Sequence, residues 1–108
     1  MDRNTKTYRT LNTGAPNVPQ QIPFYSKNIR YMRITNILPV AAAFDLYVED
    51  GNMPGTAINQ QFYLAKGLLV PPGVSVVYDT DDLNLSDRLP LYINPSVLDA
   101  FSILYRLH

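Results

Sequence analysis

The feature that most constrains the fold is a rigid corner, Pro71-Pro72-Gly73, which lies between two apolar segments. The two prolines fix φ and withhold two backbone donors, so neither a helix nor a continuous strand can pass through them. Gly73 then lets the chain reverse at little steric cost. Residues 74–78, which follow, are mostly β-branched or aromatic and suit a half-buried strand. An apolar run, a rigid corner and a strand together predict a small β-sandwich.

Further segments with strand character are separated by turn residues. Alternation is clearest over residues 42–49, which should bury Phe44, Leu46 and Val48 and expose the residues between them. Pro90 should place its own strand at a sheet edge. The other expected strands are residues 29–36, 60–64, 88–94 and 98–107. Six or seven short strands without a helical stripe predict an all-β, antiparallel sandwich.

Residues 1–27 differ from the remainder because they show no periodicity of 2 or 3.6, and Pro16, Pro19 and Pro23 favour an extended path. We therefore divide the chain into an extended N-terminal arm, residues 1–27, and a β-sandwich domain, residues 28–108. Such an arm is mobile, packs on its own domain, or orders on a neighbouring subunit. The isolated apolar residues that would anchor it to a partner are Tyr8, Leu11, Val18, Ile22, Phe24 and Tyr25.

Charge is distributed unevenly along the chain. The net charge is zero, but residues 1–33 carry +5 and residues 34–108 carry −5. A basic arm beside an acidic body favours contacts between copies of the chain. The basic residues of the arm and first strand are Arg3, Lys6, Arg9, Lys27, Arg30 and Arg33. The same residues could contact phosphates, but the acidic body would repel them, so we do not expect nucleic acid to be a partner.

The residues that commonly carry catalysis are scarce. The only histidine is His108, the only glutamate is Glu49, and there is no cysteine. No serine-nucleophile, zinc-protease or phosphate-loop motif occurs. We expect a non-enzymatic protein without a cofactor. No apolar run reaches the roughly 18 residues of a membrane helix, and the first residues lack a signal-peptide core, so we expect synthesis in the cytoplasm.

One acidic cluster could hold a hard cation such as calcium. It consists of Asp79, Asp81, Asp82 and Asp87. The cluster does not fit the helix–loop–helix calcium pattern, because Asn84 stands where that pattern needs glycine. Aspartates at the end of a strand commonly solvate a turn, so we expect no metal.

The chain contains eight tyrosines, and alternation places Tyr47 and Tyr92 on outward strand faces. Exposed aromatic side chains are enriched where proteins meet, although strand propensity alone also favours tyrosine. One alternative function is therefore a carbohydrate- or calcium-dependent binding module that uses these two tyrosines and the acidic loop. The absence of tryptophan counts against sugar stacking.

Five segments occur in a suggestive order: residues 33–36 (RITN), 44–48 (FDLYV), 67–77 (GLLVPPGVSVV), 83–91 (LNLSDRLPL) and 98–103 (LDAFSI). This order resembles small virion structural proteins of tailed bacteriophages. The likeness covers about residues 28–107. It departs from the family pattern at Ser86-Asp87, where that pattern has Gly-Asp.

The resemblance implies an immunoglobulin-like sandwich without enzymatic activity, located in the virion. The role it favours is a head decoration or cement subunit whose arm docks on neighbouring subunits. An accessory neck, tail or baseplate protein is the alternative within the same family. The implied partners are other virion proteins and copies of the chain itself.

Overall fold

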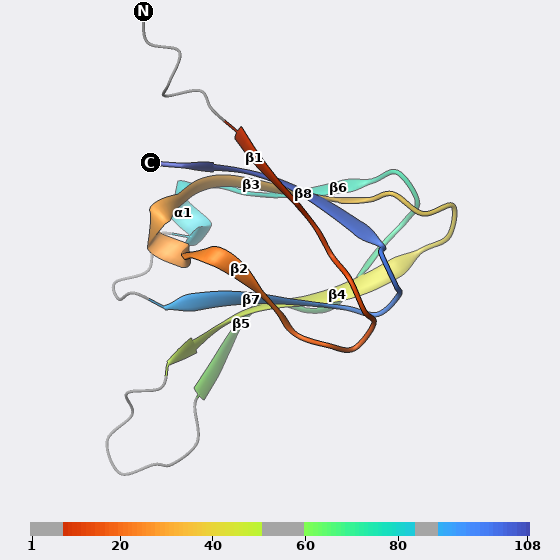
Figure 1. Cartoon of the computed structure of the whole chain (residues 1–108), viewed down its shortest axis with the longest axis horizontal. Coiled ribbons are helices and arrows are strands. Elements are labelled where there is room, and N and C mark those ends of the chain that lie inside the picture. The colour runs from red at the N-terminus through yellow and green to blue at the C-terminus, as the bar shows by residue number, and fades with distance from the viewer. Residues whose placement is uncertain (1–7, 51–59, 84–88) are drawn as a thin grey trace, which may run out of the picture.

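The computed structural model describes residues 8–50, 60–83 and 89–108. Its strands form two four-stranded antiparallel sheets that pack face to face (Figure 1). Sheet A has the strand order β1-β8-β3-β6, and sheet B has the order β2-β7-β4-β5. The elements are β1 (Tyr8–Asn12), β2 (Gln20–Tyr25), the 3-10 helix η2 (Ser26–Asn28), β3 (Ile29–Asn36), β4 (Ala42–Asp50), β5 (Gln60–Val70), β6 (Ser75–Tyr78), α1 (Thr80–Leu83), β7 (Pro90–Pro95) and β8 (Phe101–Leu107). The predicted all-β sandwich is confirmed, with eight strands.

The two additional strands come from the segment expected to be an arm. β1 pairs with β8 from Tyr8↔Arg106 to Asn12↔Ser102, and β2 pairs with β7. Of the three arrangements considered for the arm, residues 8–25 therefore adopt the one in which it packs on its own domain. Pro16 and Pro19 lie in the connection between the strands, and Pro23 lies on an edge strand, where a missing N–H is tolerated. Residues 1–7, with Arg3 and Lys6, lie outside the described residues.

Two other expectations about strands are corrected. β7 is not an edge strand, because it lies between β2 and β4. Pro90 is its first residue, a position where proline does not interrupt the ladder. β5 continues to Val70 and does not end at Leu64. It passes through two register shifts and through Gly67, whose φ of +61° favours glycine.

The core lies between the sheets and consists of inward-facing side chains from both. Phe44 of sheet B meets Phe101 of sheet A edge to face, with 5.2 Å between ring centroids. The inward set predicted for residues 42–49 is confirmed, and β3 buries Met32 and Ile34. Other fully buried side chains are Ile22, Ile29, Leu46, Leu83, Leu91, Ile93 and Ile103. Each buried side chain of this size contributes about 1.5–3 kcal/mol of hydrophobic stabilisation.

Asn36, at the end of β3, joins the rigid corner to the core. Its side chain is fully buried, and Nδ2 donates to the carbonyl oxygens of Val40 and Val70, each at 2.9 Å. Its Oδ1 accepts from the Leu38 N–H at 2.9 Å. The Asn36 backbone oxygen accepts from the N–H of Gly73, whose φ is +74°. The Thr-Asn strand end and the Pro-Pro-Gly corner are thus one hydrogen-bonded unit.

Two buried hydroxyls hold the first strands in place. Thr13 Oγ1 donates to the Phe101 carbonyl oxygen at 3.3 Å and accepts from the Phe101 N–H at 3.0 Å, extending the contact between β1 and β8. Ser26 Oγ donates to the Leu83 carbonyl oxygen at 2.7 Å and joins η2 to α1. All three bonds connect residues far apart in sequence, so the segment from Thr13 to Ser26 is part of the tertiary structure.

Candidate interaction surfaces

The outer face of sheet B carries a row of three tyrosines on neighbouring strands. Tyr47 on β4 stacks on Tyr92 of β7 at 5.5 Å with an interplanar angle of 18°, and it lies 5.2 Å from Tyr63 of β5. Tyr47 points outward as expected but is only 4% exposed, because the neighbouring rings flank it. The expectation that Tyr47 is an exposed aromatic is therefore wrong, and Tyr92 is half-buried.

The tyrosine rings in this row contact other side chains of the same chain. Lys66 Nζ lies 4.6 Å from the Tyr63 ring centroid and covers one end of the row. Burial raises the pKa of Tyr47, and the nearby Glu49 carboxylate raises it further. A sugar needs an open ring face on which to stack, and Tyr47 does not offer one because it is buried between its neighbours, whereas Tyr63 is 40% exposed.

The outer face of sheet A carries a second aromatic cluster that contains two arginines. Arg33 on β3 lies over the Tyr31 ring at 5.9 Å and donates from Nε to the Tyr31 hydroxyl at 3.1 Å. Arg106 on β8 lies over the Tyr8 ring at 5.6 Å. The two tyrosines meet edge to face at 6.1 Å. Aromatic rings therefore position both guanidinium groups on an open sheet face.

The predicted arm anchors divide into two groups. Ile22 is fully buried, and Leu11 and Phe24 pack against the core, so these three stabilise the sandwich. Tyr8, Val18 and Tyr25 are exposed, between 40% and 54%, and are available to a partner.

The predicted basic residues do not form one patch. Arg9 lies over the Phe24 ring at 5.4 Å, and Lys27 is half-buried in η2. Arg30 is exposed near α1, where its carbonyl oxygen accepts from Thr80 Oγ1. Among the predicted basic residues that the structure describes, only Arg33 lies in the aromatic cluster on the outer face of sheet A. Its companion Arg106 was not predicted as a site residue, and it joins the cluster because β8 pairs with both β1 and β3.

The acidic loop caps a turn. Asp79 Oδ1 accepts from the N–H of Asp81 at 3.0 Å, and Asp82 Oδ2 accepts from the N–H of Asp79 at 3.1 Å. These bonds account for aspartates at the exit of β6. No group of three or more potential metal-ligating side chains occurs within the described ranges. Asp87 lies outside them.

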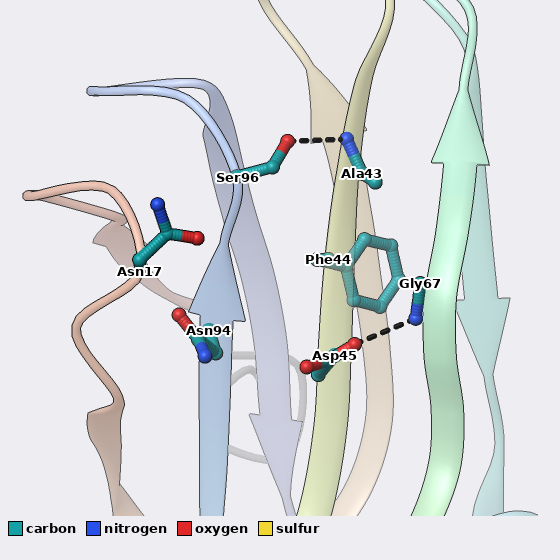
Figure 2. A pocket seen from close by; sticks show the side chains of 7 residues that line it. All are labelled: Asn17, Ala43, Phe44, Asp45, Gly67, Asn94 and Ser96. Atoms are coloured by element: carbon teal, nitrogen blue, oxygen red, sulfur yellow. Dashed lines mark hydrogen bonds between the residues drawn. The ribbon is translucent and has the colours of Figure 1, made fainter.

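A small hollow lies on the outer face of sheet B, near the ends of β4 and β7 (Figure 2). Its volume is about 160 Å³. Asp45 Oδ1 accepts from the Gly67 N–H at 2.6 Å, and Ser96 Oγ accepts from the Ala43 N–H at 2.9 Å. The Asn94 Oδ1 atom is buried without a hydrogen-bond partner. The hollow is lined by Asn17, Ala43, Phe44, Asp45, Gly67, Asn94 and Ser96.

This hollow offers hydrogen-bond acceptors but contains no nucleophile beside a base. Its acceptors suit a cationic or hydrogen-donating group. A second hollow, of about 230 Å³, is lined by Gln21, Pro23, Phe24, Tyr25 and Asn28 and has no carboxylate.

No family model matches the chain, and no curated protein or solved structure matches it. Within the part of the chain that the structure describes, none of the helices has the length and apolar character needed to cross a membrane.

Proposed function

We propose that this chain is a non-enzymatic structural subunit of a tailed-bacteriophage particle, and specifically a head decoration subunit. The phage context rests on the resemblance of residues 28–107 to virion proteins of this kind. A binding role is supported by the surface of the sandwich. Arg33 and Arg106 lie over tyrosine rings, and large apolar side chains are exposed around a well-packed core.

Exposed apolar side chains gather along β5, β6 and the corner between them. Leu69 is 65% exposed on the outer side of β5, and Val77 is 50% exposed on the outer side of β6. The others in this region are Phe62, Leu68 and Val74. β5 and β6 are each one of the two edge strands of their sheet. Unpaired edges with apolar side chains favour association with another protein.

The proposed contact differs from a strap formed by the whole N-terminal segment. Because β1 pairs with β8 and β2 pairs with β7, these strands are not available to extend across a neighbouring subunit. In the revised proposal the sandwich binds as a preformed block, which avoids the entropy cost of ordering an arm on binding. Tyr8, Val18 and Tyr25 add exposed contacts at its margin.

The test is to locate and count the chain in purified particles of the phage that encodes it. Quantitative mass spectrometry gives the copy number relative to the major capsid protein, and cryo-electron microscopy gives the position. A decoration subunit should occur at a fixed ratio to capsid protein over the head surface. A few copies confined to the neck or tail would replace the decoration role by the accessory role. Absence from particles would contradict the proposal.

A further inference from the structure

β6 differs from the other three edge strands of the sandwich. Edge strands commonly carry a feature that discourages pairing with another chain, such as a charge on the core side, a proline or an irregular ladder. β1 has Arg9 on the side of the buried Tyr105, and β2 contains Pro23. β5 passes through two register shifts. β6 is short, but it has no charge, no proline and no register shift.

Two residues of β6 direct their backbone groups away from the sheet. The Asn36 N–H donates to the Val74 carbonyl oxygen, so Val74 occupies a hydrogen-bonded position beside β3. Such positions alternate in an antiparallel pair, so the N–H and C=O groups of Ser75 and Val77 point away from β3. Outside this ladder, no backbone hydrogen bond among the described residues involves Ser75 or Val77. The edge of sheet A at β6 (Figure 1) is therefore open to an added strand.

We propose that two copies of this chain pair through β6, antiparallel and related by a two-fold axis at Val76, so that their A sheets join into one continuous sheet. The inference rests on the proposed assembly role and gives it a partner and a surface. Ser75 of each copy then lies across from Val77 of the other. Each of these pairs can exchange both of its backbone hydrogen bonds, which satisfies the outward groups of both residues. A two-fold contact of this kind closes as a dimer.

The boundaries of β6 favour a second copy over a longer strand as its partner. At one end, Gly73 and Val74 both bond to Asn36, as in a β-bulge, and this ends the regular edge. At the other end, Asp79 leaves the strand for a turn that its own carboxylate caps. Only residues 75–77 can pair, so a longer strand gains no further bonds, whereas β6 of a second copy matches this length. Identical strands without charge do not repel one another.

Exposed apolar side chains surround the proposed contact. Val77 is 50% exposed and Val74 is 44% exposed. Leu69, at the other side of the Pro-Pro-Gly corner, is 65% exposed. Removing part of this surface from water adds to the stabilisation by the backbone bonds. Because the paired segment is short, we expect the dimer to depend on protein concentration.

Val77→Pro tests the backbone bonds. The Val77 N–H points away from β3, so proline removes a donor from the contact and leaves the ladder within the sheet intact. The matched control is Thr10→Pro on β1, at the opposite edge of sheet A. The Thr13 N–H donates to the Phe101 carbonyl oxygen, and the same alternation directs the Thr10 N–H away from β8.

A second pair of variants changes side chains only, so the test does not depend on the folding of the proline variants. Ser75→Lys places a charge on the proposed contact, and lysine on an edge strand opposes pairing. Asn12→Lys is its matched control, because strand register places Asn12 and Ser75 in one row at opposite edges of sheet A. Circular dichroism and thermal unfolding establish that each variant is folded.

Sedimentation velocity over a concentration series gives the oligomeric state. The mean mass of the wild-type chain should rise toward that of a dimer as the concentration is raised to about 1 mM. Val77→Pro and Ser75→Lys should each dimerise at least about tenfold more weakly, and the two controls should behave as wild type. Salt at about 0.5 M should not dissociate the dimer, because the contact contains no ion pair.

Amide hydrogen exchange at the same concentrations locates the contact. The Ser75 and Val77 amides should exchange more slowly as the dimer forms, and the Thr10 amide should not change. A wild-type chain that stays monomeric would overturn the proposal, and so would a dimer in which these two amides gain no protection. A monomer still found on phage particles would leave the proposed function intact. A dimer that is absent from the particles would contradict the proposed function alone.

Discussion

Asn36 shows how one buried polar side chain can join three segments of a small sandwich. Its amide and carbonyl groups bond to Val40, Val70 and Leu38, and its backbone bonds to the corner at Gly73 and Val74. A satisfied buried amide specifies one arrangement of these segments, because any other arrangement leaves polar groups unpaired.

Replacing Asn36 by alanine should lower the free energy of unfolding by about 3 kcal/mol. The substitution leaves two carbonyl oxygens and one N–H without their partners, and each unpaired group in a buried site costs about 1–3 kcal/mol unless water reaches it. Urea denaturation measures the change. Asn12→Ala, at an exposed position of β1, is the control and should change stability by less than about 0.5 kcal/mol. A similarly small loss for Asn36→Ala would contradict this account of the corner.

Tyr47 should make the protein sensitive to alkaline pH. Its pKa in the folded chain is raised above the ordinary 10.0, by burial first and by Glu49 second. Above about pH 10 the unfolded chain therefore loses this proton while the folded chain keeps it, and stability falls as pH rises through the folded pKa. Below pH 10 the contribution is fully present.

The measurement is the free energy of unfolding of wild type and Tyr47→Phe at several values between about pH 8 and about pH 11. The variant should lose less stability over the alkaline part of this range. Tyr78 retains its own contribution, because burial and then Asp82 raise its pKa as well. Parallel profiles for wild type and Tyr47→Phe would contradict the assignment.

At the scale of elements, the first two strands act as the closing edges of both sheets. β1 completes sheet A beside β8, and β2 completes sheet B beside β7 and contributes Ile22 to the core. Without them, β7 and β8 would become edges and the core would open at that side.

Deleting residues 1–25 should therefore prevent folding. The deletion removes both edge strands, the Thr13 bonds to Phe101 and the burial of Ile22. A chain lacking only residues 1–7 keeps both strands and is the control. Two-dimensional amide NMR and calorimetry distinguish the outcomes: the longer deletion should give collapsed amide dispersion and no cooperative transition. A well-dispersed spectrum from residues 26–108 would restore the arm interpretation.

The elements that could be predicted from the sequence are those with strong alternation. In residues 42–49 and 101–107, apolar side chains alternate with others and so indicate one buried and one open face. The Pro-Pro-Gly corner indicates a turn through the backbone properties of proline and glycine. The edge strands were missed because β1 and β2 place few side chains in the core and β2 contains a proline. Pairing partners such as β1 with β8 depend on distant segments, which local patterns do not encode.

The same limit applies to the candidate surfaces. Alternation predicts correctly that Tyr47 points outward, but only the register of β4 with its neighbours covers it with Tyr63 and Tyr92. Likewise, Arg33 and Arg106 share a face because β3 pairs with β8. The sequence shows which kinds of side chain each strand carries, and the pairing of the strands determines which of these side chains contact one another.

At the scale of the whole molecule, charged side chains lie on the outer faces of the sandwich, and the core between the sheets is mostly apolar. The sequence shows charge asymmetry along the chain, but the fold changes where it lies: Arg106, from the acidic part of the sequence, joins Arg33 on one face. Surface side chains of this kind can change while the core stays the same, so the contacts that the protein makes with partners can vary independently of its fold.

The position of β8 has a consequence for biosynthesis. It follows every other strand in the sequence, yet it lies between β1 and β3 inside sheet A. Sheet A therefore cannot form on the ribosome until residues 101–107 have left the exit tunnel, and β1 must wait for them without its partner. Sheet B and the β3–β6 pair involve only earlier residues and can form first, so the completion of sheet A is the step that waits for the last strand.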